Sequence, residues 1–141
     1  MNVLLSIKPE FVEKIFNKEK LFEYRKTIFR QRVDKVIIYS TMPEGKIVGE
    51  FRVVRILHDD PEHIWELTNN KSGISYSFFH KYFSQKKEAY AIQIGELEKY
   101  ENPIDPREFD FHFTAPQSFF YVDDNCRPIG KREDLMESTL F

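Results

Sequence analysis

The strongest constraint on the fold is a pair of strand-forming segments that are separated by only a few residues. Residues 33–40 are rich in β-branched residues and predict a buried central strand. Residues 46–57 predict a long strand with Ile47 and Phe51 on one face. Between them, Met42-Pro43-Glu44-Gly45 is typical of a turn. A β-sheet must therefore form the centre of the molecule.

The rest of the chain adds short strands and short helices to this centre. Further strands are predicted over residues 3–7, 20–26, 88–97 and 118–122, and helices are predicted to begin at Pro9, at Asp60-Pro61 and after Ser75. The aromatic residues Phe78, Phe79, Tyr82 and Phe83 have helical spacing, which predicts that they pack on the sheet. Five or six strands with two or three helices indicate the α+β class, as a small barrel or as an open sheet.

The composition indicates one domain with a core of large rings. The chain has 141 residues, of which 41% are hydrophobic and 14 are Phe. We assign residues 1–122 to this domain and residues 123–141 to a polar C-terminal tail that could contain one helical turn. No stretch has the roughly 18 apolar residues of a membrane span, and the N-terminus is too short in apolar length for a signal peptide.

The cysteine and histidine content argues against several kinds of site. Cys126 is the single cysteine, so it forms no internal disulfide or multi-cysteine metal site, and a reducing, cytoplasmic location is expected. The four histidines lack the spacing of metal ligands, and the five glycines form no phosphate-binding loop. We therefore expect neither a metal nor a cofactor.

The charge is distributed unevenly along the chain. Residues 1–57 carry 12 Lys and Arg against 7 Asp and Glu, whereas residues 58–141 carry 9 against 16. The net charge of −2 argues against a general nucleic-acid binder. A local basic surface in the first half remains compatible with this balance, and so does ordinary fluctuation of charge along the chain.

The segment from Lys20 to Lys26 carries the clearest chemical motif. On an extended strand Glu23 and Arg25 lie on the same face. Arg25 could bind a phosphate or a base edge through two parallel hydrogen bonds, and Lys26 adds a further positive charge. Lys20 and Glu23 could act as an acid/base pair. The alternative is a structural Arg–Glu ion pair that braces the mouth of a barrel.

Five further residues are candidate ligand contacts because of their places in the predicted elements. Lys8 lies at the start of the first helix, where anions are attracted, or it is simply solvated. Tyr39 and Ser40 end a predicted strand, and Tyr39 could stack on a base or fill the core. Gln117 and Ser118 follow a proline and could contact a ligand or belong to an ordinary loop.

Three segments in this order resemble the ASCH branch of the PUA-like superfamily. They are Leu5-Ser6-Ile7-Lys8-Pro9, then Lys20-Leu21-Phe22-Glu23-Tyr24-Arg25-Lys26, and then residues 36–41 leading into 47–51. The family motif is G-x-K-x-x-E-x-R, and Lys20, Glu23 and Arg25 match its last three positions. Lys18 stands where the family has glycine, so a non-glycine residue would have to form that turn. The resemblance covers residues 3–122.

The resemblance implies a PUA-like barrel with a cleft beside the first helix. ASCH domains are proposed to bind RNA or nucleotide-like ligands there, and some members are small hydrolases or ribonucleases. In the hydrolase type a Thr is expected three residues after the motif lysine, whereas this chain has Glu23.

Three functional hypotheses follow from these observations. The first is a module that binds RNA or a nucleotide-like molecule through Lys8, Lys20, Glu23, Arg25 and their neighbours. The second is a small metal-independent hydrolase, either a nucleoside amidohydrolase or a ribonuclease, that uses Lys20 and Glu23 as catalytic residues. The third is a protein-interaction domain, in which the acidic second half contacts a protein partner.

Overall fold

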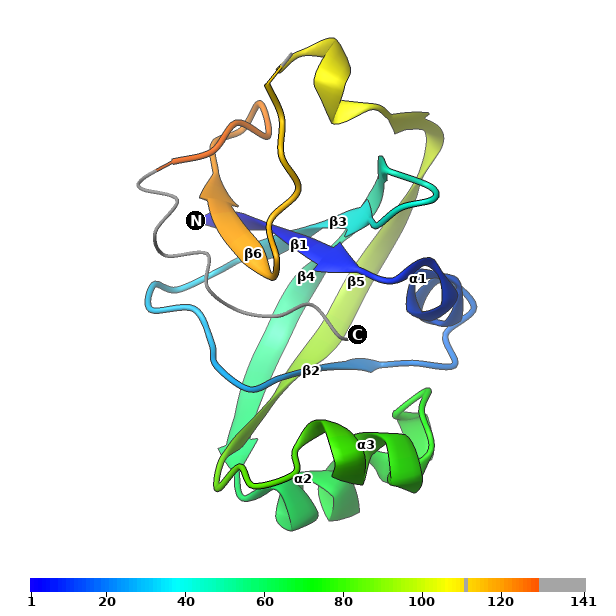
Figure 1. Cartoon of the computed structure of the whole chain (residues 1–141), viewed down its shortest axis with the longest axis vertical. Coiled ribbons are helices and arrows are strands. Elements are labelled where there is room, and N and C mark those ends of the chain that lie inside the picture. Colours follow the sequence, from blue (N-terminus) through cyan, green and yellow to red (C-terminus); the bar gives the residue numbers. More distant parts are fainter. Residues whose placement is uncertain (111, 130–141) are drawn as a thin grey trace.

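A single curved sheet of six strands forms the centre of the molecule in the computed structural model, which describes residues 1–110 and 112–129 (Figure 1). The strand order is β2-β5-β4-β3-β1-β6, so β2 and β6 are the two edge strands. Neighbouring strands are antiparallel except for β1 and β3, which are parallel. The elements are β1 (Asn2–Ile7), α1 (Pro9–Phe16), β2 (Phe22–Arg25), β3 (Lys35–Ser40), β4 (Lys46–Asp59), α2 (Pro61–Thr68), η1 (Asn69–Lys71), α3 (Tyr76–Tyr82), β5 (Ala89–Ile104), η2 (Pro106–Glu108) and β6 (Phe119–Val122).

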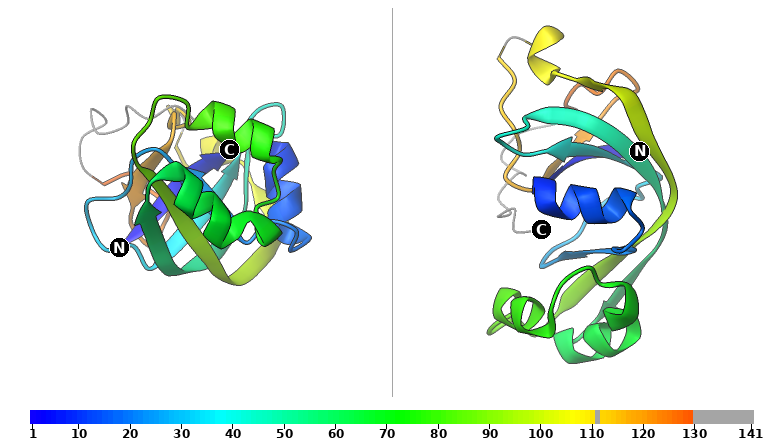
Figure 2. Two further views of the ribbon diagram at one scale, coloured as in Figure 1. Left: turned by 90° about the horizontal axis from the view of Figure 1, so that it is seen from below. Right: turned by 90° about the vertical axis from the view of Figure 1, so that its right-hand side faces the viewer.

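The two longest strands, β4 and β5, give the sheet its curvature. Their pairing contains three register shifts, and bulges of this kind bend a strand and increase its twist. The sheet therefore curls into a half-barrel around α1, while α2 and α3 lie together at one end (Figure 2). This arrangement confirms the predicted α+β class, and the described residues form six strands and three α-helices where five or six strands and two or three helices were predicted.

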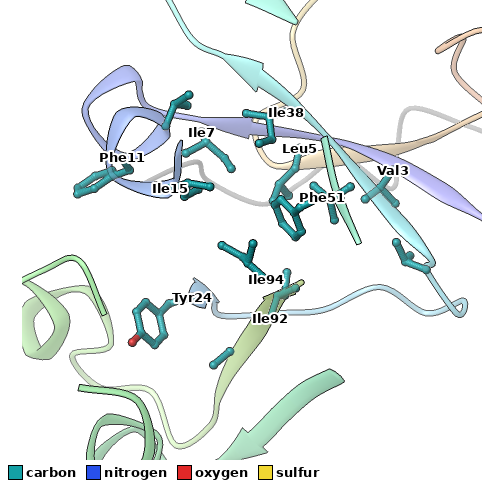
Figure 3. Close-up of a cluster of buried hydrophobic side chains, with 14 of the residues drawn as sticks. Val3, Leu5, Ile7, Phe11, Ile15, Tyr24, Ile38, Phe51, Ile92 and Ile94 are labelled. Atoms are coloured by element: carbon teal, nitrogen blue, oxygen red, sulfur yellow. The ribbon is translucent and has the colours of Figure 1, made fainter. Parts of the chain in front are cut away.

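The main core lies between the concave face of the sheet and the helices. Figure 3 shows Leu5, Ile7 and Ile38 of β1 and β3 in this cluster, together with Phe51 of β4 and Ile15 of α1. A smaller core lies on the opposite face of β1 and β3. It contains the buried residues Leu4, Ile37, Tyr39, Ile47, Phe120 and Val122.

Two predictions about the long strands were wrong. Ile47 and Phe51 belong to different cores because the register shift between Ile47 and Gly49 reverses the alternation of side chains. The strand predicted over residues 88–97 continues to Ile104 and includes Pro103. This proline lies beyond the segment of β5 that pairs with β2, so its missing N–H removes no bond to that strand.

The helix starts agree with the sequence. Asp60 and Ser75 are N-caps whose side chains accept hydrogen bonds from the backbone N–H of His63 and Phe78. The side chain of Phe78 is 38% exposed, however, so it packs less completely on the core than predicted. Within the described residues, no helix is long and apolar enough to cross a membrane.

The beginning of the predicted C-terminal tail folds back on β6. The backbone N–H of Ile129 donates to the carbonyl of Tyr121 at 2.8 Å, and Val122 and Pro128 form a β-bridge. The helical turn suggested for the end of the chain lies outside the described residues.

Candidate functional site

A tight turn after α1 leads into the segment Lys20–Lys26, which carries the motif. Lys18 has a φ of 62°, a left-handed conformation that glycine adopts most readily. The backbone N–H groups of Glu19 and Lys20 both donate to the carbonyl of Lys14, at 2.9 and 3.1 Å. A lysine thus forms the turn for which the family motif has a glycine.

Glu23 and Arg25 form a fully buried ion pair on one face of β2. The side chains are 0% and 2% exposed. Nε and Nη2 of Arg25 donate to the same oxygen of Glu23, Oε2, at 3.1 and 2.6 Å. Such a doubly hydrogen-bonded pair fixes the orientation of the carboxylate.

Arg25 also connects the two edges of the curved sheet. Its Nη2 donates to the carbonyl oxygen of Ser6 in β1 at 3.0 Å, and its Nη1 donates to Oγ of Ser118, just before β6, at 3.0 Å. Arg25 itself lies on β2, the opposite edge strand. The side chain therefore bridges the open seam of the half-barrel, which is the bracing geometry that the sequence left open as an alternative.

Lys20 is buried beside this pair. Its Nζ donates to the carbonyl of Ser72 at 3.2 Å, lies 3.7 Å from Oε1 of Glu23, and lies 4.7 Å from the centre of the Tyr24 ring. Burial is the main reason why the pKa of Lys20 falls to about 8, and the negative charge of Glu23 partly opposes this fall. A substantial fraction of this amine is therefore neutral slightly above physiological pH.

One oxygen of Glu23 lacks a hydrogen-bond donor. Within the described part of the chain, Oε1 of Glu23 and Oγ of Ser40 are buried without a hydrogen-bond partner. The 3.7 Å separation from Nζ of Lys20 is an ion pair but is too long for a hydrogen bond. Buried polar atoms without partners are uncommon and often mark places where a ligand or water binds.

A short loop between η1 and α3 covers Lys20. The carbonyl of Lys71 accepts from the backbone N–H of Leu21 at 2.9 Å, and the carbonyl of Gly73 accepts from Nζ of Lys14 at 2.9 Å. Gly73 has a φ of 71°, and a Cβ at this position would meet the Cβ of Lys20 at 2.5 Å. The sequence did not indicate that Lys14, Ser72 or Gly73 belong to the site; the available signal was the glycine at position 73, a residue that readily adopts a left-handed turn.

The other predicted contacts differ in how close they lie to this cluster. Ser118 hydrogen-bonds Arg25 and so belongs to the cluster, whereas the neighbouring Gln117 is exposed. Lys8 is the half-buried N-cap residue of α1. Nζ of Lys26 lies 4.5 Å from the centre of the Tyr82 ring.

Tyr39 lies apart from the cluster. Its ring belongs to the smaller core on the other face of the sheet and contacts Phe113 at a centroid distance of 5.4 Å. Burial raises the pKa of its hydroxyl group. Ser40, the next residue, is fully buried at the end of β3.

One group of potential metal ligands lies elsewhere, at the start of α2. Among the described residues, Asp59, Asp60 and His63 bring one oxygen or nitrogen each within 4.8 Å of one another. Nδ1 of His63 and Oδ2 of Asp59 are 2.5 Å apart, and Asp60 caps the helix. These groups therefore satisfy one another, and the contact with Asp59 raises the pKa of His63.

Comparisons with known proteins place the chain among several relatives. A family model described as a domain of unknown function, DUF365, matches residues 1–111. In Ureaplasma parvum the chain is 30% identical over 121 residues to ATP synthase subunit alpha and 29% identical over 121 residues to large ribosomal subunit protein uL22. The alignments cover 85% of this chain but only 15% and 39% of those two proteins.

A third relative has a similar length. The ASCH domain-containing ribonuclease of Zymomonas mobilis is 24% identical over 126 residues, which cover 84% of this chain and 82% of that protein. The crystal structure of ASCH from Zymomonas mobilis superposes with a TM-score of 0.81 at 21% identity and covers 98% of this chain and 96% of that one. The superposition shows a shared fold.

Proposed function

Because the chain belongs to the DUF365 family and has the fold of ASCH domains, we propose that it is a module that binds single-stranded RNA or a nucleotide. One nucleotide would bind against β2, at Lys20, Glu23 and Arg25. Single-stranded nucleotides are the usual targets of small RNA-binding domains because their bases are free to be contacted on their edges.

The buried charged cluster is the observation that supports this proposal. Three charged side chains have at most 2% exposure, and one carboxylate oxygen among them accepts no hydrogen bond within the described residues. Burial of charge is costly, and a purely structural pair needs no additional buried lysine. Buried groups with a shifted pKa, such as Lys20, concentrate at functional sites.

Access to this cluster requires movement of its cover. The loop Ser72–Gly73 holds Lys20 through the carbonyl of Ser72, so it has to shift before a nucleotide reaches the ammonium. Binding would thus be coupled to a local opening, as is common at ligand sites.

A binding titration tests this proposal. We expect fluorescence anisotropy to detect binding of a labelled single-stranded RNA decamer, and we expect Lys20→Met to weaken this binding at least about tenfold, because it removes a charged donor. Lys99→Met, at an exposed lysine of β5, is the matched control and should bind like the wild type. Equal affinity of the Lys20→Met protein, with circular dichroism confirming its fold, would place the RNA elsewhere.

A second candidate function is favoured by the lowered pKa of Lys20 together with the ribonuclease from Zymomonas mobilis among the relatives. In this case the neutral amine of Lys20 removes the proton from a ribose 2′-hydroxyl. The 2′-oxygen then forms a bond to the adjacent phosphorus, the bond from phosphorus to the 5′-oxygen breaks, and the leaving oxygen takes up a proton. The products are a 2′,3′-cyclic phosphate and a free 5′-hydroxyl end.

The pH dependence of cleavage tests this second candidate. Cleavage in EDTA should rise as the pH increases through about 8, where Lys20 loses its proton, and should disappear in Lys20→Met. Cleavage that needs added metal, or that survives in Lys20→Met, would exclude Lys20 as the base.

A further inference from the structure

The hydrogen bonds of Arg25 restrict what this residue can do for a ligand. A guanidinium group has five N–H donors. Four bonds are made inside the protein, two to Glu23, one to the carbonyl of Ser6 and one to Ser118. A phosphate held through two parallel bonds would have to displace contacts that bridge the sheet edges. Arg25 is therefore poorly suited to bind phosphate.

Glu23, unlike Arg25, can still accept a hydrogen bond from a ligand, because one of its two carboxylate oxygens has no donor within the described residues. Oε2 receives both bonds from Arg25, whereas Oε1 has no hydrogen-bond partner within the described residues. The two hydrogen bonds from Arg25 hold Oε2 in place, and Oε1 lies on the side of Lys20, 3.7 Å from its Nζ. An ionised carboxylate is an acceptor only, and a ligand atom that satisfies it must therefore be a donor.

We propose that Oε1 of Glu23 accepts a hydrogen bond from an N–H group of a nucleobase, so that the buried part of the site recognises the base and not the phosphate. This inference rests on the proposed RNA- or nucleotide-binding function and specifies which part of the nucleotide enters. A phosphate would bring a second negative charge next to a buried carboxylate, whereas an N–H group supplies the missing donor.

The neighbouring ammonium group agrees with this choice of ligand. Nζ of Lys20 lies 3.7 Å from Oε1, so an acceptor and a donor lie side by side. The edges of adenine, cytosine and uracil each present an N–H donor next to an acceptor atom. A base edge would match both protein groups at once when the Ser72–Gly73 loop opens.

Pairs of nucleosides that differ in a single donor group, either an exocyclic amino group or a ring N–H, test the inference. Calorimetric titrations of the wild-type protein would use adenosine against purine riboside, cytidine against pyrimidin-2-one riboside, and uridine against 3-methyluridine. For the nucleoside that binds, we expect its partner to bind at least about tenfold more weakly, because a charged acceptor is left unpaired. Inorganic phosphate should not compete with it. Equal affinities within every pair, or competition by phosphate, would overturn the inference.

Glu23→Gln provides a second test, which compares the ratio of the two affinities within a nucleoside pair and does not depend on their absolute values. The amide oxygen of the glutamine would face Arg25, so an NH₂ group would replace Oε1 and the acceptor would be lost. The ratio of affinities within the pair should then fall to about one, whereas Glu50→Gln, at another hydrogen-bonded carboxylate, should keep the wild-type ratio. A retained ratio in Glu23→Gln would overturn the assignment. If this variant does not fold, the wild-type pairs alone decide.

The failure of the inference and that of the proposed function give different results. RNA binding without discrimination within any pair contradicts base recognition by Glu23 and leaves the proposed function intact. Absence of binding to RNA and to every nucleoside contradicts both.

Discussion

Arg25 of the edge strand β2 hydrogen-bonds to Ser118, just before the other edge strand β6, and to Ser6 in β1. Arg25→Met should therefore destabilise the protein by about 3–5 kcal/mol, because it leaves the carboxylate of Glu23 buried without its partner. Urea denaturation measures this change. The double variant Arg25→Met with Glu23→Leu should recover part of the loss, since no carboxylate is then buried without its guanidinium partner, although Lys20 loses its ion pair with Glu23. A loss below about 1 kcal/mol in the single variant would contradict the bracing role.

Lys20 should make the stability depend on pH in the alkaline range. Its pKa is about 8 in the folded state and 10.5 in the absence of burial, so between these values the unfolded state binds more protons. The free energy of unfolding should therefore rise with pH from about 8 upwards, by up to about 3 kcal/mol relative to Lys20→Met. Above pH 10 the raised pKa of the buried Tyr24 acts in the opposite direction. Parallel pH profiles of wild type and Lys20→Met would show that Lys20 keeps its ordinary pKa.

Lys18 carries the backbone strain of the turn before the motif. Lys18 adopts the left-handed conformation, which costs a non-glycine residue about 1–2 kcal/mol of folding free energy through steric strain. Glycine avoids this strain, but ordering its more flexible unfolded chain costs roughly 0.5–1 kcal/mol. Lys18→Gly should thus stabilise the protein by about 0.5–1 kcal/mol, whereas Lys18→Ala should change little. Thermal unfolding compares the three proteins. A lower melting temperature for the glycine variant would argue against strain at this turn.

Among the elements, the loop between η1 and α3 controls how far Lys20 is covered. Lys14→Met removes the bond from α1 to the carbonyl of Gly73 and leaves the Lys20–Glu23–Arg25 cluster unchanged. We expect the rate of reductive methylation of Lys20, followed by peptide mass spectrometry, to increase several-fold in this variant. Lys99→Met, which removes an exposed lysine on β5, should leave the rate unchanged. If Lys20 of the wild type already reacts as fast as the exposed lysines, the loop does not cover it.

The elements also differ in how well the sequence predicts them. Helix starts were predictable because Asp60 and Ser75 cap them through local bonds to residues three positions ahead. The register shifts of β4 and β5 were not predictable, because they arise from pairing between residues 30 to 57 positions apart in the sequence, from Asp59 with Ala89 to Ile47 with Ile104. The faces of Ile47 and Phe51, and the extension of β5 through Pro103, depend on these shifts.

For the whole molecule, the pattern predicted the α+β class but left a barrel and an open sheet possible, whereas the family resemblance predicted a PUA-like barrel. The curved sheet closes through hydrogen bonds from the guanidinium group of Arg25 to the backbone carbonyl of Ser6 and to the hydroxyl group of Ser118, and these residues are as much as 112 positions apart in the sequence. Such contacts follow from the tertiary arrangement. The motif predicted that Lys20, Glu23 and Arg25 lie together, but Tyr39 lies on the far side of the sheet, because its orientation depends on which face of β3 meets α1.

The central claim is that a nucleotide binds at the Lys20–Glu23–Arg25 cluster. Photo-crosslinking of a 4-thiouridine-containing RNA, followed by mass spectrometry of the crosslinked peptides, tests it most directly. We predict crosslinks in peptides that contain residues 20–26 and 116–118, and their loss in Lys20→Met but not in Lys99→Met. Crosslinks confined to α2 and α3, with the same pattern in both variants, would contradict the claim and would leave the buried cluster as a brace of the half-barrel.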